Sequence, residues 1–322
     1  MEQTNPTQHN IKEQSFINNC TGSNRDFEEK IVKLLLLAMA LTSVLALALI
    51  GFFIFKEGMP IFLEYGLFNV IFGTTWNPTN QIYGIFPMIV GTILVTAVAL
   101  IIGAPMGIAV AVFLAEIAPQ KYAQIVRPAI ELLAGIPSVV YGLFGMVVIR
   151  EIISAVAKGP FGDILPAHYQ TGYSVLAGGI ILAIMILPTV INISEDAIRC
   201  VPKEYKEGAM ALGASKWQNI YTVVVPAAKS GILAAIILGI GRALGETMAI
   251  IMVVGNTVLI PELGWEGLFA PVRSMTGNIA LEMGYAGPEH RQALFATGIV
   301  LFVFIMFLNS LTMALAKRGN KR

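Results

Sequence analysis

The chain has 322 residues, of which 56% are hydrophobic and only 13% are charged, and its mean hydropathy is +0.74. These values lie outside the composition of ordinary soluble domains and indicate a polytopic membrane protein. The net charge is +1, with no basic cluster interleaved with aromatic residues, which excludes a nucleic-acid-binding protein. The cysteines and histidines share no ligand spacing, so we predict no metal site and no cofactor.

Residues 1–30 are rich in Asn, Gln, Thr and Glu and predict a polar solvated tail, helical only near residues 26–30. We expect a transmembrane domain over residues 31–316 and a basic tail over residues 317–322. A helix needs roughly 20 apolar residues to cross a bilayer, and six runs reach that length. These are Leu34–Phe55, Ile85–Leu114, Ala129–Ile149, Val175–Ile193, Ser230–Val254 and Ala293–Leu315. Pro105, with Gly103 and Gly107 beside it, predicts a kink or a broken turn in the second run.

The distribution of lysine and arginine predicts the orientation of the chain. With the N-terminus inside, fifteen of these residues fall in the inner segments, five in the outer loops, and Arg242 alone within the membrane. Inner loops carry the excess of Lys and Arg. We therefore expect a multi-pass protein of the plasma membrane with both termini in the cytoplasm.

The fifth run contains Arg242 and Glu246 at its centre, and Arg242 lies roughly 18 Å of helix from either end. An ion at that depth costs on the order of 2.5 to 3.5 kcal/mol, so such residues usually face a bundle interior or a transport path. Spacing of four places the two on one helix face, close enough to pair, and Gly241 and Gly245 predict the close approach of another helix. Two interpretations follow: a substrate path, or a neutral pair that only fixes helix packing.

The inner segment 195–229 alternates charged and apolar residues at helical spacing, and predicts two short helices joined by a turn at Gly213, the second capped by Ser215. An interfacial helix and a docking element are both compatible with this pattern. The EAA loop of ABC importer permeases is resembled by Glu207-Gly208-Ala209, followed by three residues, Gly213, nine residues and then Val223 to Pro226. We call residues 195–229 the EAA-like loop. In that family the loop forms the coupling helix that docks on the ATPase subunit.

Further motifs resemble the PstC family of phosphate permease subunits. They are Gly241-Arg242-Ala243-Leu244-Gly245-Glu246-Thr247, Trp76-Asn77-Pro78, Tyr83-Gly84-Ile85-Phe86-Pro87 and Leu133 to Gly142. The resemblance implies an all-α MetI-like fold of the type I ABC importers, with six transmembrane helices and a cytoplasmic coupling helix. It implies phosphate import with a PstA-like second permease, a PstB-like ATPase dimer and a PstS-like binding protein, in contact with membrane lipid. It also implies that this chain is not itself an enzyme.

In the path interpretation, Arg242 contacts the anion and Glu246 competes for Arg242, which speeds release. Three alternatives stay open. The substrate is another oxyanion such as sulfate, molybdate or phosphonate; or the chain is a stand-alone secondary transporter or channel; or it is a membrane scaffold or sensor that recruits a partner to the EAA-like loop.

Overall fold

The computed structural model describes the backbone of residues 6–262 and 264–319, and the side chains of residues 29–262 and 264–310. The chain divides into two units, residues 1–56 and residues 57–322. The described part of the first unit belongs to helix α1, Pro6–Tyr65. The prediction that the polar N-terminal segment is helical only near residues 26–30 is therefore wrong for its described part. Side chains 29–50 of α1 are all exposed and mostly apolar, as in a helix surrounded by lipid.

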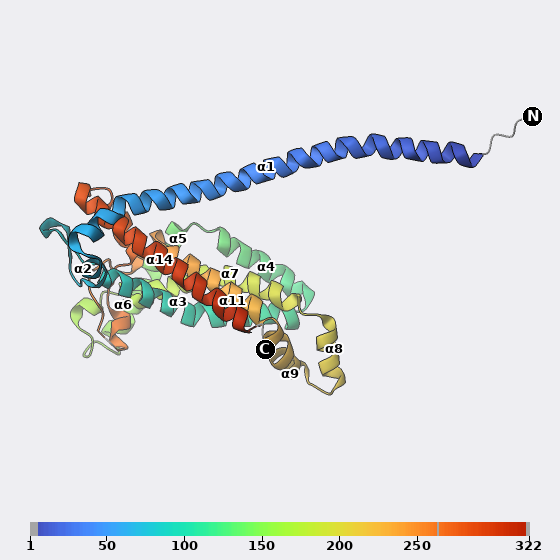
Figure 1. The fold of residues 1–322 in the computed structure, drawn as a ribbon. Coiled ribbons are helices and arrows are strands. Elements are labelled where there is room, and N and C mark those ends of the chain that lie inside the picture. The colour runs from blue at the N-terminus through green and yellow to red at the C-terminus, as the bar shows by residue number, and fades with distance from the viewer. Residues whose placement is uncertain (1–5, 263, 320–322) are drawn as a thin grey trace, which may run out of the picture. The chain divides into compact units, whose positions relative to one another are not determined.

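The core of the second unit is built by α3 (Phe86–Val112), α7 (Val175–Arg199) and α11 (Lys229–Gly245), which pack against one another (Figure 1). Glycines allow the close approach of α3 and α7: a Cβ atom on Gly103 would lie 2.9 Å from Ile186, and one on Gly107 2.8 Å from Val190. Between them, Pro105 faces away from α7 and is exposed. Helix α3 continues through Pro105, so the predicted broken turn is not formed.

The described residues contain five helices long and apolar enough to cross a membrane. The helix pair 216–227 and 229–245, bent by 67°, makes a sixth if it counts as one span. The five are Glu29–Tyr65, Phe86–Ile117, Ser138–Lys158, Val175–Arg199 and Pro288–Ser310, the last within α14 (Pro288–Gly319). The prediction of an all-α multi-pass membrane protein is confirmed.

The third predicted span, Ala129–Ile149, is wrong because the helix breaks inside it. Helix α4 (Gln120–Gly135) ends before Pro137, and a new helical segment begins at Ser138. Pro137 lacks a backbone N–H and disfavours the helical conformation in the residue before it, and Ile136 has the extended angles φ −71° and ψ 129°. The apolar span is thus residues 138–158, formed by α5 (Ser138–Phe144), a π-helical turn η3 (Gly145–Ile149) and α6 (Arg150–Lys158).

The fifth predicted span, Ser230–Val254, is also not one helix. Helix α11 ends at Gly245, Glu246 adopts the extended angles φ −69° and ψ 130°, and α12 (Met248–Val253) starts two residues later. Arg242 and Glu246 are therefore on opposite sides of a break.

The remaining elements lie between the spans. On the side of the EAA-like loop they are η2 (Phe113–Ile117), α8 (Lys203–Ala211), α9 (Lys216–Asn219), η5 (Ile220–Val224) and α10 (Val225–Ala227). The others are α2 (Leu67–Phe72), η1 (Pro78–Asn80), η4 (Ala167–Tyr169), η6 (Glu266–Phe269), α13 (Met275–Glu282) and the antiparallel hairpin of β1 (Trp76–Asn77) and β2 (Ile82–Tyr83).

Candidate functional site

The two broken helices meet in the core. Helix α5, which follows the first break, packs against α12, which follows the second. A Cβ atom on Gly142 would lie 2.6 Å from Met252 Sδ and 3.1 Å from Ala249 Cα, so glycine allows the two helices to approach closely without displacing Met252. The Tyr141 hydroxyl donates a 2.7 Å hydrogen bond to the Leu133 carbonyl across the first break. The breaks are therefore defined by specific contacts.

Glu246 caps the short helix that follows its own break. Its Oε1 accepts hydrogen bonds from the backbone N–H groups of Thr247, at 3.1 Å, and Ala249, at 3.2 Å. A carboxylate at this position satisfies N–H groups that have no partner in the helix and interacts favourably with the helix dipole. The Glu246 carbonyl in turn accepts a 3.0 Å hydrogen bond from Thr276 Oγ1. The Glu246 carboxylate is thus bound to backbone N–H groups that follow it directly in the chain.

Arg242 lies in the last turn of α11 and does not pair with Glu246. Its Nη1 donates a 3.3 Å hydrogen bond to Thr189 Oγ1 on α7. That is the one hydrogen bond of its guanidinium within the described part of the chain. The predicted pair of Arg242 and Glu246 is wrong because the helix ends between them, and the four-residue spacing no longer places them on one face. A half-buried guanidinium with most donors uncommitted remains beside the break.

Two glycines near the end of α11, Gly241 and Gly245, face open space. Apart from the adjoining backbone of the helix itself, no described atom lies within 4 Å of a Cβ atom built on either one. The helix approach that their spacing predicts is therefore not made by the described part of this chain. This face of α11, next to Arg242, is open to another molecule.

The EAA-like loop forms the two predicted short helices. Gly213 makes the turn with φ 89°, and Ser215 caps α9 through a reciprocal pair of hydrogen bonds with Gln218. Two apolar side chains of this loop, Leu212 and Trp217, are 91% and 62% exposed. Of the EAA-like positions, Ala209 is half-buried and the others are exposed: Glu207, Gly208, Gly213 and Pro226. The loop presents an apolar outer face.

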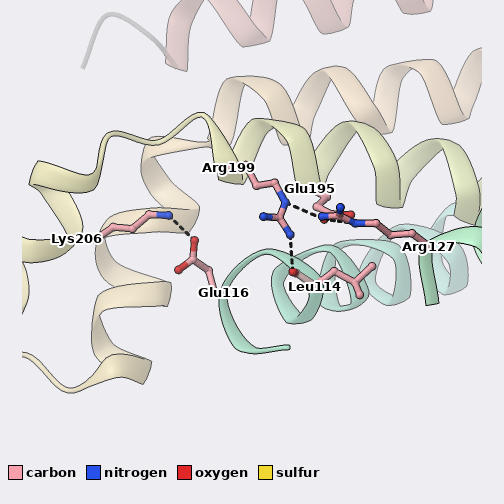
Figure 2. A network of polar contacts seen from close by, with 6 residues as sticks. All are labelled: Leu114, Glu116, Arg127, Glu195, Arg199 and Lys206. Carbon is pink, nitrogen blue, oxygen red and sulfur yellow. Dashed lines mark hydrogen bonds and ion pairs between the residues drawn. The ribbon is translucent and has the colours of Figure 1, made fainter. Parts of the chain in front are cut away.

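A polar network holds the base of this loop and the helices beside it (Figure 2). Glu195, only 6% exposed, accepts hydrogen bonds at the same oxygen, Oε1, from Arg127 of α4 and from Arg199 Nε at 2.8 Å. Arg199 Nη2 also donates to the Leu114 carbonyl at 2.8 Å. Glu195 thus ties α4 to α7, and Arg199 ties α7 to η2, which continues α3.

Lys206 of α8 contacts the same region. Its Nζ lies 2.5 Å from Glu116 Oε1, with both side chains largely buried. Asn219 of α9 donates a 3.1 Å hydrogen bond to the Lys206 carbonyl. Glu116, near the end of the second span, is therefore held in an ion pair. The pair fixes the EAA-like loop to η2, which continues α3.

A second cluster, which the sequence did not reveal, joins the segments at the other end of the spans. Glu282 accepts hydrogen bonds from Trp76 Nε1 at 2.8 Å and Arg273 Nη1 at 2.5 Å, and its Oε2 lies 2.8 Å from His290 Nε2. These groups come from the hairpin, the loop before α13 and the start of α14. Beside them lies a cavity of about 640 Å³ with Tyr83 in its wall. Burial and the negative charge of Glu289 raise the pKa of Tyr83 to about 12.

The fold and these sites define a class: a helical multi-pass membrane subunit with broken helices around a half-buried arginine, and an exposed two-helix loop. Residues 103–321 match the model of the family described as "Binding-protein-dependent transport system inner membrane component". The chain belongs to this family.

Relatives that match over most of the chain support its assignment to this family. The chain is 39% identical over 299 residues to a probable ABC transporter permease protein, YqgH, of Bacillus subtilis, which covers 90% of this chain and 92% of the relative. It is 36% identical to the phosphate transport system permease protein PstC of Pasteurella multocida, covering 79% and 81%. The predicted resemblance to the PstC family is confirmed.

Solved structures share the fold. The MetNI methionine ABC transporter in an inward-facing conformation matches with a TM-score of 0.56 at 16% identity, over 76% of this chain and 99% of that one. A bacterial ABC transporter for the acidic polysaccharide alginate also matches at 0.56, with 18% identity, over 86% and 95%. The predicted MetI-like fold is confirmed.

Proposed function

We propose that this chain is the permease subunit of an ATP-driven ABC importer that carries inorganic phosphate into the cytoplasm. The observation that carries the proposal is the likeness to PstC permeases, at 36%, 37% and 35% identity over 71–79% of this chain. Family members are transport components, so hydrolysis of ATP is assigned to a separate subunit and not to this chain.

Arg242 is the residue that we propose contacts the anion. A guanidinium always carries its charge and offers planar donors that match phosphate oxygens. The donors that Arg242 does not use on Thr189 are available for this contact, and the adjacent face of α11 at Gly241 and Gly245 is open. We assign that face to the path shared with a PstA-like second permease.

The role proposed for Glu246 changes with the structure. Because its carboxylate is bound to the N–H groups of Thr247 and Ala249, it holds the break and the start of α12, and so positions Arg242. It acts on the path through geometry instead of competing with phosphate for the arginine.

The EAA-like loop is the proposed docking element for a PstB-like ATPase dimer. Its exposed apolar side chains, including Leu212 and Trp217, favour a protein contact, and its base is tied to the spans by Lys206 and Glu116. We therefore assign the loop and both termini to the cytoplasm, in agreement with the excess of Lys and Arg in these segments. A PstS-like binding protein then delivers phosphate from the opposite side.

The test is phosphate uptake by the four-component complex in proteoliposomes. Arg242→Gln is expected to reduce uptake about 10-fold or more, the equivalent of one charge-assisted hydrogen bond, while the complex still assembles. Lys158→Gln, a loss of the same charge at an exposed position, is the control and is expected to transport normally.

Normal uptake by Arg242→Gln would refute the assignment of the path. Competition with sulfate, molybdate and phosphonate identifies the substrate, because inhibition by one of them at phosphate-like concentrations favours a different oxyanion. Transport by this chain without its ATPase would favour a secondary transporter instead.

A further inference from the structure

The network around Glu195 has more positive than negative charge. Two guanidiniums, of Arg127 and Arg199, meet one carboxylate, and both use its Oε1 (Figure 2). Within the described part of the chain, no other carboxylate contacts either arginine. The two arginines and Glu195 therefore carry a net charge of +1, because the buried carboxylate compensates only one of the two guanidinium charges.

The guanidiniums also have donors to spare. Arg127 uses Nε and Nη2, and Arg199 uses Nε for Glu195 and Nη2 for the Leu114 carbonyl. The Nη1 groups of both make no hydrogen bond within the described residues. Each side chain is a little over 40% exposed, so these donors are accessible.

Both arginines line a cavity of about 390 Å³. The amide residues Gln120 and Gln124 also line it, together with apolar residues of η2 and of the segment that follows it. Its walls thus offer cationic forks and neutral polar groups, which is the chemistry that binds a tetrahedral oxyanion.

The position of the cavity relative to the spans fits a phosphate group. Arg199 is the last residue of the span 175–199, and Leu114 lies near the end of the span 86–117. The cavity therefore opens where two apolar spans end, at the depth at which lipid phosphates and dissolved anions both occur.

We propose that this cavity is a binding site for a phosphate-type oxyanion, held by Arg127 and Arg199. The ligand is either free phosphate or the phosphate of an anionic lipid headgroup. The site is distinct from the path at Arg242, and the proposal does not depend on phosphate being the transported substrate. Because Glu195 offsets part of the charge and water reaches both arginines, binding is weak and reversible.

The test is a local fluorescence measurement on the assembled transporter in lipid nanodiscs. Cys20 and Cys200 are replaced by Ser, and an environment-sensitive fluorophore is attached at Gln124→Cys, in the cavity wall. In nanodiscs of neutral phosphatidylcholine, inorganic phosphate is expected to change the signal saturably. Arg127→Gln should weaken this response at least 5-fold, whereas Lys121→Gln, the same charge loss on the same helix but outside the cavity, should leave it unchanged.

Nanodiscs that contain phosphatidylglycerol distinguish the two sources. If the anionic lipid produces the change by itself and makes phosphate ineffective, the site binds headgroups; if it does not, the ligand is free phosphate. Either result supports the site. Gln120→Glu adds a carboxylate to the wall without removing an arginine, and should also weaken the response. No saturable change with phosphate or with anionic lipid, or equal responses in Arg127→Gln and Lys121→Gln, would overturn the proposal.

Discussion

Glu195→Gln tests how much the inner network stabilises the assembled subunit. The substitution keeps the shape of the side chain and removes the charge that both arginines share. A hydrogen bond to a charged group is worth about 1.5–3 kcal/mol and a neutral one about 0.5–1.5, so each arginine loses about 1 kcal/mol. The exposure of Arg127 and Arg199 to solvent makes this loss smaller. The repulsion between the two cations, which are left adjacent without a carboxylate, makes it larger. We expect the free energy of unfolding to fall by about 2 kcal/mol in total.

The measurement is the thermal unfolding of the purified complex in detergent, where a loss of this size lowers the midpoint by roughly 4 °C. Glu151→Gln is the matched control, because Glu151 pairs with Arg150 at a site where the carboxylate is 62% exposed. Its expected loss is less than about 0.5 kcal/mol. If both variants shift the midpoint equally, the buried carboxylate does not carry the stability assigned to it.

Three further substitutions follow from individual contacts. Glu246→Gln keeps an acceptor for the α12 N–H groups and should assemble normally, whereas Glu246→Ala removes the cap and should lower the unfolding midpoint, by about 1 kcal/mol in stability. Gly107→Ala should destabilise by about 1–3 kcal/mol because its Cβ atom would lie 2.8 Å from Val190, and Gly51→Ala, with open space around it, should not. Lys206→Glu should uncouple ATP hydrolysis from uptake by repelling Glu116, and the swap with Glu116→Lys should restore most of the coupling; a double variant no better than either single one contradicts this pairing.

Local signals in the sequence predicted the elements that local chemistry determines. Ser215 is followed three residues later by Gln218, and the structure has that capping box. Gly213 has the positive φ that a turn between two helices needs. The apolar run that begins at Val175 is a single helix, which extends to Arg199; near its end Glu195 pairs with Arg199 one turn later and with Arg127 of α4.

The breaks show where such reasoning was insufficient. The first break has a visible signal, since Pro137 lies in an apolar run, yet hydropathy alone joined residues on both sides of it. The second break follows Gly245, the last residue of α11, but one glycine inside an apolar run was not enough to predict it. The extended backbone at Glu246 is stabilised by the hydrogen bond from the Ala249 N–H to the Glu246 carboxylate and by Thr276, which is distant in sequence. The sharing of Glu195 between α4 and α7 is likewise a long-range contact without a pattern in the sequence.

The breaks also determine where this subunit can bend. Within α7, backbone N–H groups bond carbonyls one turn earlier, except at Pro188, which has no N–H, so bending the helix away from this proline deforms several bonds at once. At the first break the Tyr141 hydroxyl bonds the Leu133 carbonyl, and at the second the Glu246 side chain bonds backbone N–H groups. Side-chain contacts of this kind can re-form after a rotation of one segment against the next, because side-chain torsions adjust. Helices α5 and α12 pack together between these two points, and Arg242 lies in the last turn of α11, directly before the second break. A rotation at that break would therefore change the surroundings of the half-buried cation.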